Sequence, residues 1–207
     1  MKLNIINKCF LIILLSLKFT LPAICQTENF SSRIFFPGAV GLNIPSGDEQ
    51  TSIKAGFSLL TAIEYRPQYT NNIFFRFNYD VLSNKYIGLP SRVPTNVTQG
   101  KLSASFLMLG VGYRHSVGRY AIYALIQPGF NLSSYSRASD NSTGISISNV
   151  SRDHPALKIS TGIEYYIVPH FALVAEPGFY HSFEVRNGFI LNSNYLSYNI
   201  GFTTTLF

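Results

Sequence analysis

The chain has 207 residues, of which 46% are apolar, 14% are aromatic and only 13% carry a charge. Soluble domains usually carry about 25% charged residues, and intrinsic disorder requires few aromatic residues and a high net charge, so neither class fits. After the N-terminus no uncharged apolar run reaches the ~18–20 residues of a membrane-spanning helix. A helical membrane bundle is therefore excluded, and one β-rich domain with an apolar exterior remains.

Residues 1–25 are typical of a secretory signal peptide that is cleaved on export. The segment begins with basic residues, residues 9–17 are apolar, and Ala23 and Cys25 supply small residues ahead of a cleavage site. A retained membrane anchor and a lipoprotein signal ending at Cys25 are alternatives. The apolar run is short for an anchor, and the residues around Cys25 match a lipoprotein signal poorly.

Cleavage changes both the charge and the chemistry of the chain. It removes three lysines and no acidic residue, so thirteen basic and ten acidic residues remain and the net charge falls from +6 to about +3. Basicity then gives no support for a nucleic-acid partner. Both cysteines leave with the signal, and four scattered histidines have no metal-ligand spacing. We expect no nucleic acid, metal or cofactor. Residues 26–31 form a short N-terminal lead, and 32–207 form the folded domain.

From residue 32 onward apolar and polar residues alternate with a period of two, which is the pattern of β-strands. Between Ile53 and Arg66, for example, the odd positions are mostly apolar, while Lys54, Glu64 and Arg66 fall on even positions. This alternation predicts eight strands, over residues 32–44, 52–66, 73–84, 101–115, 119–132, 155–168, 171–186 and 194–207.

The connections between these strands differ in length. Residues 67–72, 116–118 and 169–170 are short turns, whereas 85–100 and 133–154 are long and polar. Short and long connections on an even number of antiparallel strands are typical of outer-membrane barrels. The prediction is therefore an all-β fold, an eight-stranded antiparallel up-and-down transmembrane β-barrel. A soluble β-sandwich with its apolar faces turned inward is the main alternative, and a spacing near 50 residues between similar segments also allows a propeller.

Two prolines fall inside predicted strands, in the sequences Gln127-Pro-Gly-Phe130 and Glu176-Pro-Gly-Phe179. Proline cannot donate a hydrogen bond to a strand ladder, and a closed barrel has no free edge to hold it. We predict that Pro128 and Pro177 mark β-bulges. The alternative is that each proline ends its strand early.

Strand parity predicts which charged residues face the interior. An eight-stranded interior is narrow enough for side chains to fill it, and buried charges must be paired. The sequence thus predicts a charge network that plugs the lumen, and the alternative is a narrow conduit lined by the same groups. The residues of this network are Lys54, Glu64, Arg66, Arg76, Asp80, Arg114, Lys158, Glu164, Glu176, Glu184 and Arg186.

Three tyrosines occupy equivalent positions just before short turns or predicted strand ends. Tyr65, Tyr113 and Tyr165 each end a motif of the form small residue, Ile or Val, any residue, Tyr. Aromatic residues at this position form the interfacial girdles of membrane barrels. We therefore predict that these tyrosines lie at a membrane–water interface.

Together, the signal peptide, the eight strands, the Gly-Ile/Val-x-Tyr motif and an aromatic terminal strand make the chain similar to the small outer-membrane β-barrel proteins of Bacteroidota. More distantly, it resembles barrels of the OmpA, OmpX and OmpW type. The resemblance implies outer-membrane lipid as the surroundings and recognition of the last strand by the barrel-assembly machinery. Phe202, Leu206 and Phe207 would form that assembly signal. Phe207 departs from the family pattern because its parity places it on the face opposite to the other two.

The sequence contains no arrangement typical of an enzyme. Some small outer-membrane barrels act on lipid A, and such chemistry requires a nucleophile beside a base. His181, Ser182 and Glu184 are the nearest candidates, but His181 and Ser182 are adjacent in a strand and point to opposite faces. His154 and His170 are predicted in a loop and a turn, and His115 at a strand end.

We therefore predict a non-enzymatic outer-membrane barrel with a structural or surface-interaction role. Its long loops are the place for contacts with an extracellular partner, since rigid scaffolds commonly carry binding residues on loops. Three alternatives stay open: a narrow ion conduit, a carrier of one small apolar molecule, and an accessory barrel of a secretion or motility machine with a periplasmic partner.

Overall fold

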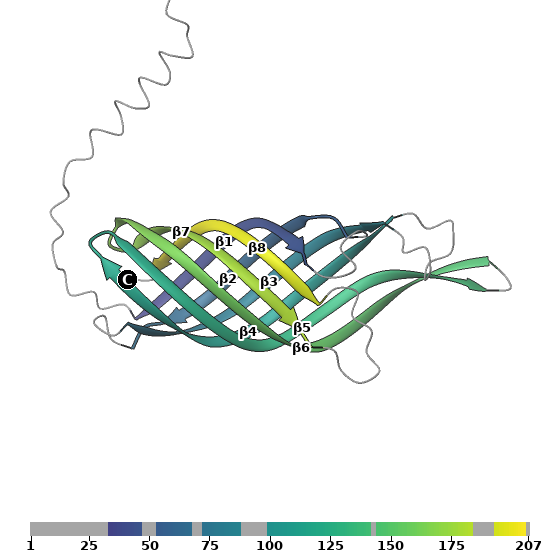
Figure 1. Ribbon diagram of the computed structural model, residues 1–207, viewed down its shortest axis with the longest axis horizontal. Coiled ribbons are helices and arrows are strands. Elements are labelled where there is room, and N and C mark those ends of the chain that lie inside the picture. Colours follow the sequence, from purple (N-terminus) through teal and green to yellow (C-terminus); the bar gives the residue numbers. More distant parts are fainter. Residues whose placement is uncertain are drawn as a thin grey trace, which may run out of the picture. The chain divides into compact units, whose positions relative to one another are not determined.

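The computed structural model describes residues 33–46, 53–67, 72–87, 99–141, 144–183 and 193–205. The predicted signal peptide (1–25), the lead (26–31) and the residues Glu184, Arg186, Leu206 and Phe207 lie outside these ranges. The described residues form one closed antiparallel sheet (Figure 1), whose strands are β1 (Ile34–Pro45), β2 (Gly56–Tyr65), β3 (Ile73–Ile87), β4 (Gln99–Val117), β5 (Tyr120–Asn141), β6 (Gly144–Val168), β7 (Phe171–Ser182) and β8 (Asn194–Thr205).

Closure of the sheet confirms the predicted fold. Each strand pairs with its neighbour in sequence, and β1 also pairs with β8, from Phe35 opposite Thr205 to Pro45 opposite Tyr195. A single closed sheet excludes both the sandwich and the propeller. None of the described residues belongs to a helix long and apolar enough to cross a membrane.

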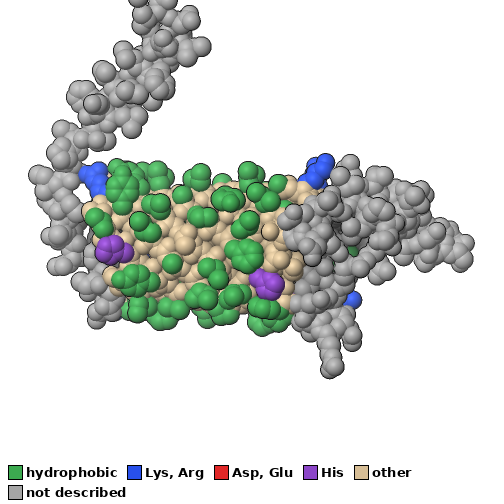
Figure 2. Space-filling model, in the orientation of Figure 1, with side chains coloured by type: hydrophobic (Ala, Val, Ile, Leu, Met, Phe, Trp, Pro, Cys, Tyr) green, Lys and Arg blue, Asp and Glu red, His purple; other side chains and the backbone are tan. Residues whose placement is uncertain are grey.

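The outer wall of the barrel is apolar. On β2, for example, Phe57, Ile63 and Tyr65 are exposed, whereas Ser58, Leu60 and Glu64 between them are buried. Hydrophobic side chains cover the wall on the face shown in Figure 2, and basic side chains are visible at its two ends. Lipid is the solvent that suits such a surface, because it offers no hydrogen-bond partners and the closed sheet satisfies its own backbone.

The prediction of a long loop over residues 133–154 is wrong for most of that segment, which continues as strands β5 and β6. β5 and β6 stay paired from Tyr120 opposite Tyr165 to Asn141 opposite Gly144. On the other side of β5, pairing with β4 reaches only Tyr135. The segments 136–141 and 144–149 therefore form a two-stranded ribbon past the end of the β4 pairing, and we call it the β5–β6 arm (Figure 1). In this Ser- and Asn-rich stretch only residues 145–148 alternate between apolar and polar residues, a signal that suggested an extension of the wall but was too short to predict the whole ribbon.

The predicted bulges at Pro128 and Pro177 are also wrong. Met108 pairs with Gly129 and Val111 with Ile126, so neither strand gains a residue around Pro128. The same holds around Pro177, and both strands continue past their proline, which excludes an early strand end as well. Since proline lacks an N–H, pairing is interrupted on one side only, without a change of register. On the other side Pro128 still faces Leu157 and Pro177 faces Tyr198. The register shift found between β6 and β7 lies instead next to a turn, between Tyr166 and Val168.

Glycines inside the barrel make room for aromatic rings. Phe74 on β3 lies directly opposite Gly112 on β4, and a Cβ atom on Gly112 would come within 2.2 Å of the Phe74 ring. Tyr123 lies in the same way over its partner Gly162, where a Cβ would come within 2.2 Å. Both rings are buried. The narrow interior is thus filled by large rings packed against residues without side chains.

We expect Gly112→Val to destabilise the barrel by about 1–3 kcal/mol, because the new side chain must displace the Phe74 ring in a filled interior. The urea midpoint of unfolding, followed by the different gel migration of unboiled folded barrel, measures the effect. Gly38→Val is the matched control, since a Cβ at Gly38 meets nothing within 4 Å. Equal midpoints for the two variants would contradict the packing described here.

Candidate functional site

The interior of the barrel holds most of the charged side chains that the structure describes, and it is the candidate functional site. Eight of the eleven residues predicted to form an inward charge network lie inside the barrel in contact with one another, seven of them buried and Arg114 partly so. Lys54 does not join them, and Glu184 and Arg186 lie outside the described residues. We call the eight the charge chain, in the order of contact: Arg114, Glu164, Arg66, Glu64, Arg76, Glu176, Lys158 and Asp80.

The charge chain begins near the short β4–β5 turn. Arg114 Nη2 lies 2.8 Å from Glu164 Oε2, and Arg66 Nη2 lies 3.1 Å from the other oxygen of Glu164. Arg66 Nε also donates to Glu64 Oε1 at 2.5 Å. The second oxygen of Glu64 accepts from Arg76 through both Nε at 2.7 Å and Nη2 at 2.6 Å. Each carboxylate at this end therefore joins two guanidinium groups from different strands.

The chain continues toward the middle of the barrel. Arg76 Nη1 donates to Glu176 Oε2 at 2.6 Å, and Lys158 Nζ lies 3.0 Å from Glu176 Oε1 and 2.9 Å from Asp80 Oδ2. Four cations thus alternate with four carboxylates, and their formal charges cancel. Removing a buried charge from water costs several kcal/mol, so alternation is the arrangement in which each charge is offset by its neighbours.

Aromatic rings line the charge chain, and the sequence analysis missed them. Every cation of the chain lies over one or more inward-facing rings. The distances from the cation to the ring centroid are 3.5 Å for Arg66 over Phe35, 4.7 Å for Arg76 over Tyr123, 5.3 Å for Arg114 over Tyr166 and 5.1 Å for Lys158 over Tyr180. Such cation–π contacts are worth most when they are desolvated, as they are here.

The same tyrosines also satisfy the carboxylates. The Tyr166 hydroxyl donates to Glu164 at 2.6 Å and the Tyr180 hydroxyl to Asp80 at 2.8 Å, while Tyr123 donates to Glu176. A tyrosine that supplies both a ring face and a hydroxyl therefore binds a cation and an anion of the chain at once. Tyr123 and Tyr180 share the strand parity of inward residues, so parity alone was a signal that could have identified them.

The interior changes character on the side away from the short turns. There it is filled by a cluster that includes Leu82, Leu102, Phe106 and Tyr195. The Phe106 and Tyr195 rings are 6.2 Å apart and nearly perpendicular, an edge-to-face arrangement that aromatic pairs favour. The lumen is thus charged and satisfied toward the turns and apolar toward the long connections.

His154 lies in this part of the interior, which corrects its prediction as a loop residue. It stands on β6 opposite Asn131, and its side chain is 1% exposed. Neither His154 ring nitrogen has a hydrogen-bond partner in the structure. Asn131 donates to the Ser182 hydroxyl at 2.9 Å, but its own Oδ1 is also without a partner. Buried polar atoms are normally satisfied, so His154 and Asn131 form a polar position in this part of the interior whose hydrogen-bonding capacity the described side chains do not fully use.

The predicted inward position of Lys54 is wrong, since its side chain is exposed. Regular pairing of β2 begins only at Gly56, and Ile53 takes the interior position instead, with 7% exposure. The Lys54 backbone is held on both sides, because its N–H donates to Lys85 O at 2.8 Å and its carbonyl accepts from Asn84 Nδ2 at 2.9 Å. Glu184 and Arg186, the other two members of the predicted network, lie outside the described residues.

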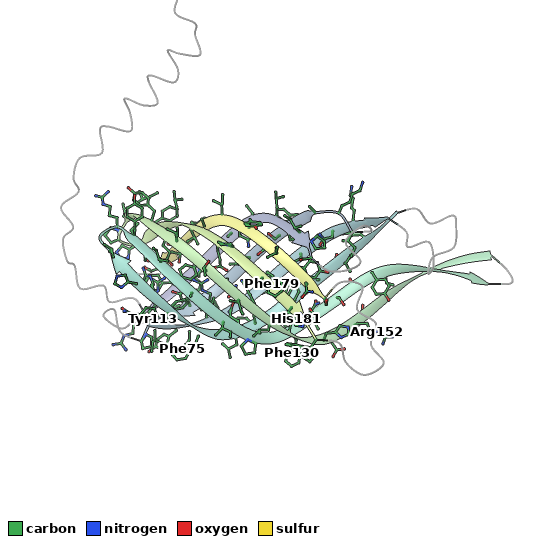
Figure 3. All side chains as sticks on the ribbon, in the orientation of Figure 1. Phe75, Tyr113, Phe130, Arg152, Phe179 and His181 are labelled. Carbon is green, nitrogen blue, oxygen red and sulfur yellow. The ribbon has the colours of Figure 1, made fainter. Side chains whose placement is uncertain are left out.

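The aromatic residues predicted for the interface lie on the outer wall near the short turns. Tyr65 and Tyr113 are exposed and Tyr165 is half-buried beside Tyr120, 5.0 Å away between ring centroids. Figure 3 shows Tyr113 near one end of the barrel. Phe130, Phe179 and His181 lie toward the other end. The wall therefore carries aromatic side chains toward both of its ends.

The remaining predicted residues are those of the terminal strand and the histidine and serine considered for enzymatic activity. Phe202 is exposed on β8 and stacks on Phe171 at 5.6 Å, whereas Leu206 and Phe207 lie outside the described residues. His181 points outward, with Nδ1 2.7 Å from Asn194 Oδ1, while Ser182 is buried on the opposite face. In the part of the chain that the structure describes, no three His, Cys, Asp or Glu residues are placed to hold a metal ion.

The fold is similar to those of solved outer-membrane proteins. Neisserial surface protein A superposes with a TM-score of 0.57 at 16% identity, over 84% of this chain and 98% of that one. A major outer membrane protein of Thermus thermophilus gives 0.57 at 13%, over 84% and 99%. OprG of Pseudomonas aeruginosa gives 0.51 at 10%, over 84% and 96%. No protein-family model and no curated protein matches the sequence. The comparisons thus establish the fold of outer-membrane barrels.

We expect Lys158→Met to destabilise the barrel by about 3–5 kcal/mol, because it leaves Asp80 and Glu176 with one uncompensated buried charge. The double variant Asp80→Asn, Lys158→Met restores neutrality and should cost less than the single change. Urea unfolding measures both, with the exposed Arg152→Met as control, expected within about 0.5 kcal/mol of the original protein. A double variant that unfolds at the same urea concentration as Lys158→Met, or at a lower one, would contradict this expectation.

Proposed function

We propose that this protein is an integral outer-membrane β-barrel with a structural or surface-interaction role, without enzymatic activity and with a lumen closed by side chains. It would be exported through a cleaved signal peptide and inserted by the barrel-assembly machinery, which would read the last strand and Phe202 in particular. The repeated motifs that resemble small barrels of Bacteroidota support this class.

The charge chain is the observation that carries the proposal. It joins residues of β2, β3, β4, β6 and β7 around the interior, including Arg66 directly after β2. Both Arg76 and Lys158 are almost fully buried. An ion that moved through this lumen would have to break several desolvated ion pairs at once. The arrangement therefore supports a plug over a conduit, and it leaves no group of the chain exposed as an acid or base for catalysis.

The outer wall supports the membrane location. Outward-facing positions of β3 from Ile73 to Ser83 carry no charge, which matches the ~9–11 residues that a tilted strand needs to cross a bilayer. Tyr65, Tyr113 and Tyr165 would then lie at the interface on the side of the short turns. In barrels of this kind, short turns face the periplasm and longer connections face the outside.

The β5–β6 arm supports a surface-interaction role. Its two segments, 136–141 and 144–149, pair with each other, and β4 pairs with β5 only as far as Tyr135. A ribbon that continues past the pairing of its neighbour carries main-chain and side-chain groups that another chain can bind. An extracellular partner, or a machine in which this barrel is an accessory subunit, would engage it there.

We expect the purified protein to give no stable single-channel steps in planar bilayers, because the charge chain closes the lumen. Replacing both Glu64 and Arg76 with Ala should open a path and produce steps. The exposed pair Arg152→Ala, Asp153→Ala is the matched control and should stay silent. Stable steps from the original protein, altered when Glu64 or Arg76 is neutralised, would instead establish a conduit.

A second candidate function is a carrier of one small, mostly apolar molecule with a polar group. The unpartnered nitrogens of His154 and the unpartnered Oδ1 of Asn131, beside an apolar cluster, favour it. Ligand sites are typically apolar with a few placed polar groups. This candidate leaves the charge chain intact, but it requires the apolar cluster that fills this part of the interior to make room for the ligand.

We expect native mass spectrometry of protein purified from membranes to detect a small-molecule adduct if this second function holds. His154→Leu should lose the adduct, because it removes the polar anchor, whereas the outward-facing His181→Leu should keep it. Protein without any adduct, or an adduct that survives in His154→Leu, would exclude the carrier function.

A further inference from the structure

Two lysines lie opposite each other on the outer wall, at the end away from the short turns, and a third lies on the neighbouring segment. Lys85 on β3 is directly opposite Lys101 on β4, and both side chains are exposed. Lys54, just before β2, is exposed too and joins them through the hydrogen bond from its N–H to Lys85 O. We call Lys54, Lys85 and Lys101 the lysine row.

The lysine row lies where the outer wall changes from apolar to polar. Along β3 and β4 the outward-facing pairs run in register toward the row. In order they are Tyr79 with Leu107, Val81 with Ser105, Ser83 with Ser103, and Lys85 with Lys101. Aromatic and aliphatic residues thus give way to small hydroxyl residues and then to ammonium groups, which is the order expected from bilayer core to headgroup region.

The row has no carboxylate partner among the side chains that the structure describes. Of the five acidic side chains described, four belong to the charge chain in the interior, and Asp153 is on β6, two strands away from β4. Like charges directly opposite each other on paired strands are destabilising. A cross-strand Lys–Lys pair with a third lysine nearby is therefore a concentration of positive charge that an external anion would offset.

We propose that the lysine row binds the phosphate group of an anionic lipid in the outer leaflet. Lysine ammonium groups bind phosphate as point charges, and basic residues just outside the hydrocarbon region attract anionic lipid headgroups. The inference rests on the proposed function, because it requires a barrel in the outer membrane with its long connections outward.

The position of the row favours a lipid over a soluble anion. Lys85 and Lys101 lie on the same outward face as the apolar pairs below them, so a phosphate held there has its acyl chains beside Leu107 and Tyr79, which are exposed. A soluble anion would gain nothing from that apolar surface. The acyl chains of a lipid would lie along it.

The test uses the full mature chain in zwitterionic detergent, titrated with bis-phosphorylated lipid A and with the same lipid after removal of its phosphates. Native mass spectrometry gives the dissociation constants. The variant Lys85→Gln, Lys101→Gln should bind the phosphorylated lipid about 30-fold more weakly, since each lysine contributes about fivefold. The variant Arg33→Gln, Arg152→Gln removes the same charge from exposed positions outside the row and should change binding less than twofold.

Stability provides a second readout, because the effect of the double variant on the urea midpoint should reverse when the phosphorylated lipid is added. Without the lipid, the double lysine variant should unfold at an equal or higher urea concentration, because repulsion between Lys85 and Lys101 is relieved. With the phosphorylated lipid, it should unfold at a lower concentration than the original protein. A purely structural role for these lysines would move both midpoints in the same direction and would overturn the proposal.

Two further outcomes would also overturn it. Equal binding of the lipid with and without its phosphates would mean that the row does not recognise phosphate. Complete competition by millimolar inorganic phosphate would identify a soluble anion as the ligand. Gel migration of unboiled samples and bilayer recordings on the same preparation report separately on the barrel and its closed lumen, so failure of the proposed function is distinguishable from failure of this inference.

Discussion

The structure depends on neutralising charge inside a closed sheet. Eight strands enclose a space that side chains must fill, and here the filling includes four cations that could not remain there alone. Each lies between carboxylates or at the end of a series that alternates in sign, and each also lies over an aromatic ring. Because these ion pairs join residues on different strands, they hold the strands together from inside the barrel, in addition to the backbone hydrogen bonds between neighbouring strands.

The interior and the exterior follow opposite rules in the same strands. Glu64 and Tyr65 are neighbours in sequence, yet one belongs to a desolvated ion-pair chain and the other to an apolar outer surface. Glycines such as Gly112 let large rings enter the narrow lumen. Where the outer surface stops being apolar, the lysine row begins. One wall thus combines an apolar outer surface, a buried charge network and a cationic edge.

Period-two alternation predicted the strands and the direction of most inward charges, because in a sheet with one polar and one apolar face parity decides where a side chain points. It failed where regular pairing stops or where both faces are polar. Lys54 lies before the regular part of β2, so parity did not apply to it. The arm and His154 lie in a Ser- and Asn-rich stretch in which apolar and polar residues alternate only over residues 145–148. Pro128 and Pro177 were expected to shift the register, but losing one hydrogen-bond donor interrupts a ladder without requiring an extra residue.

From its sequence alone, this protein is committed to eight alternating strands with apolar residues on one face and charges on the other, since composition and parity are local properties of the chain. Which charge meets which is not local. Arg66 and Glu164 are far apart in sequence and in contact in space, and only the closure of β1 on β8, together with the register of each pair, places them there. The tertiary structure therefore decided the order of the charge chain, the rings over its cations, the unpartnered position of His154 and the pairing of Lys85 with Lys101.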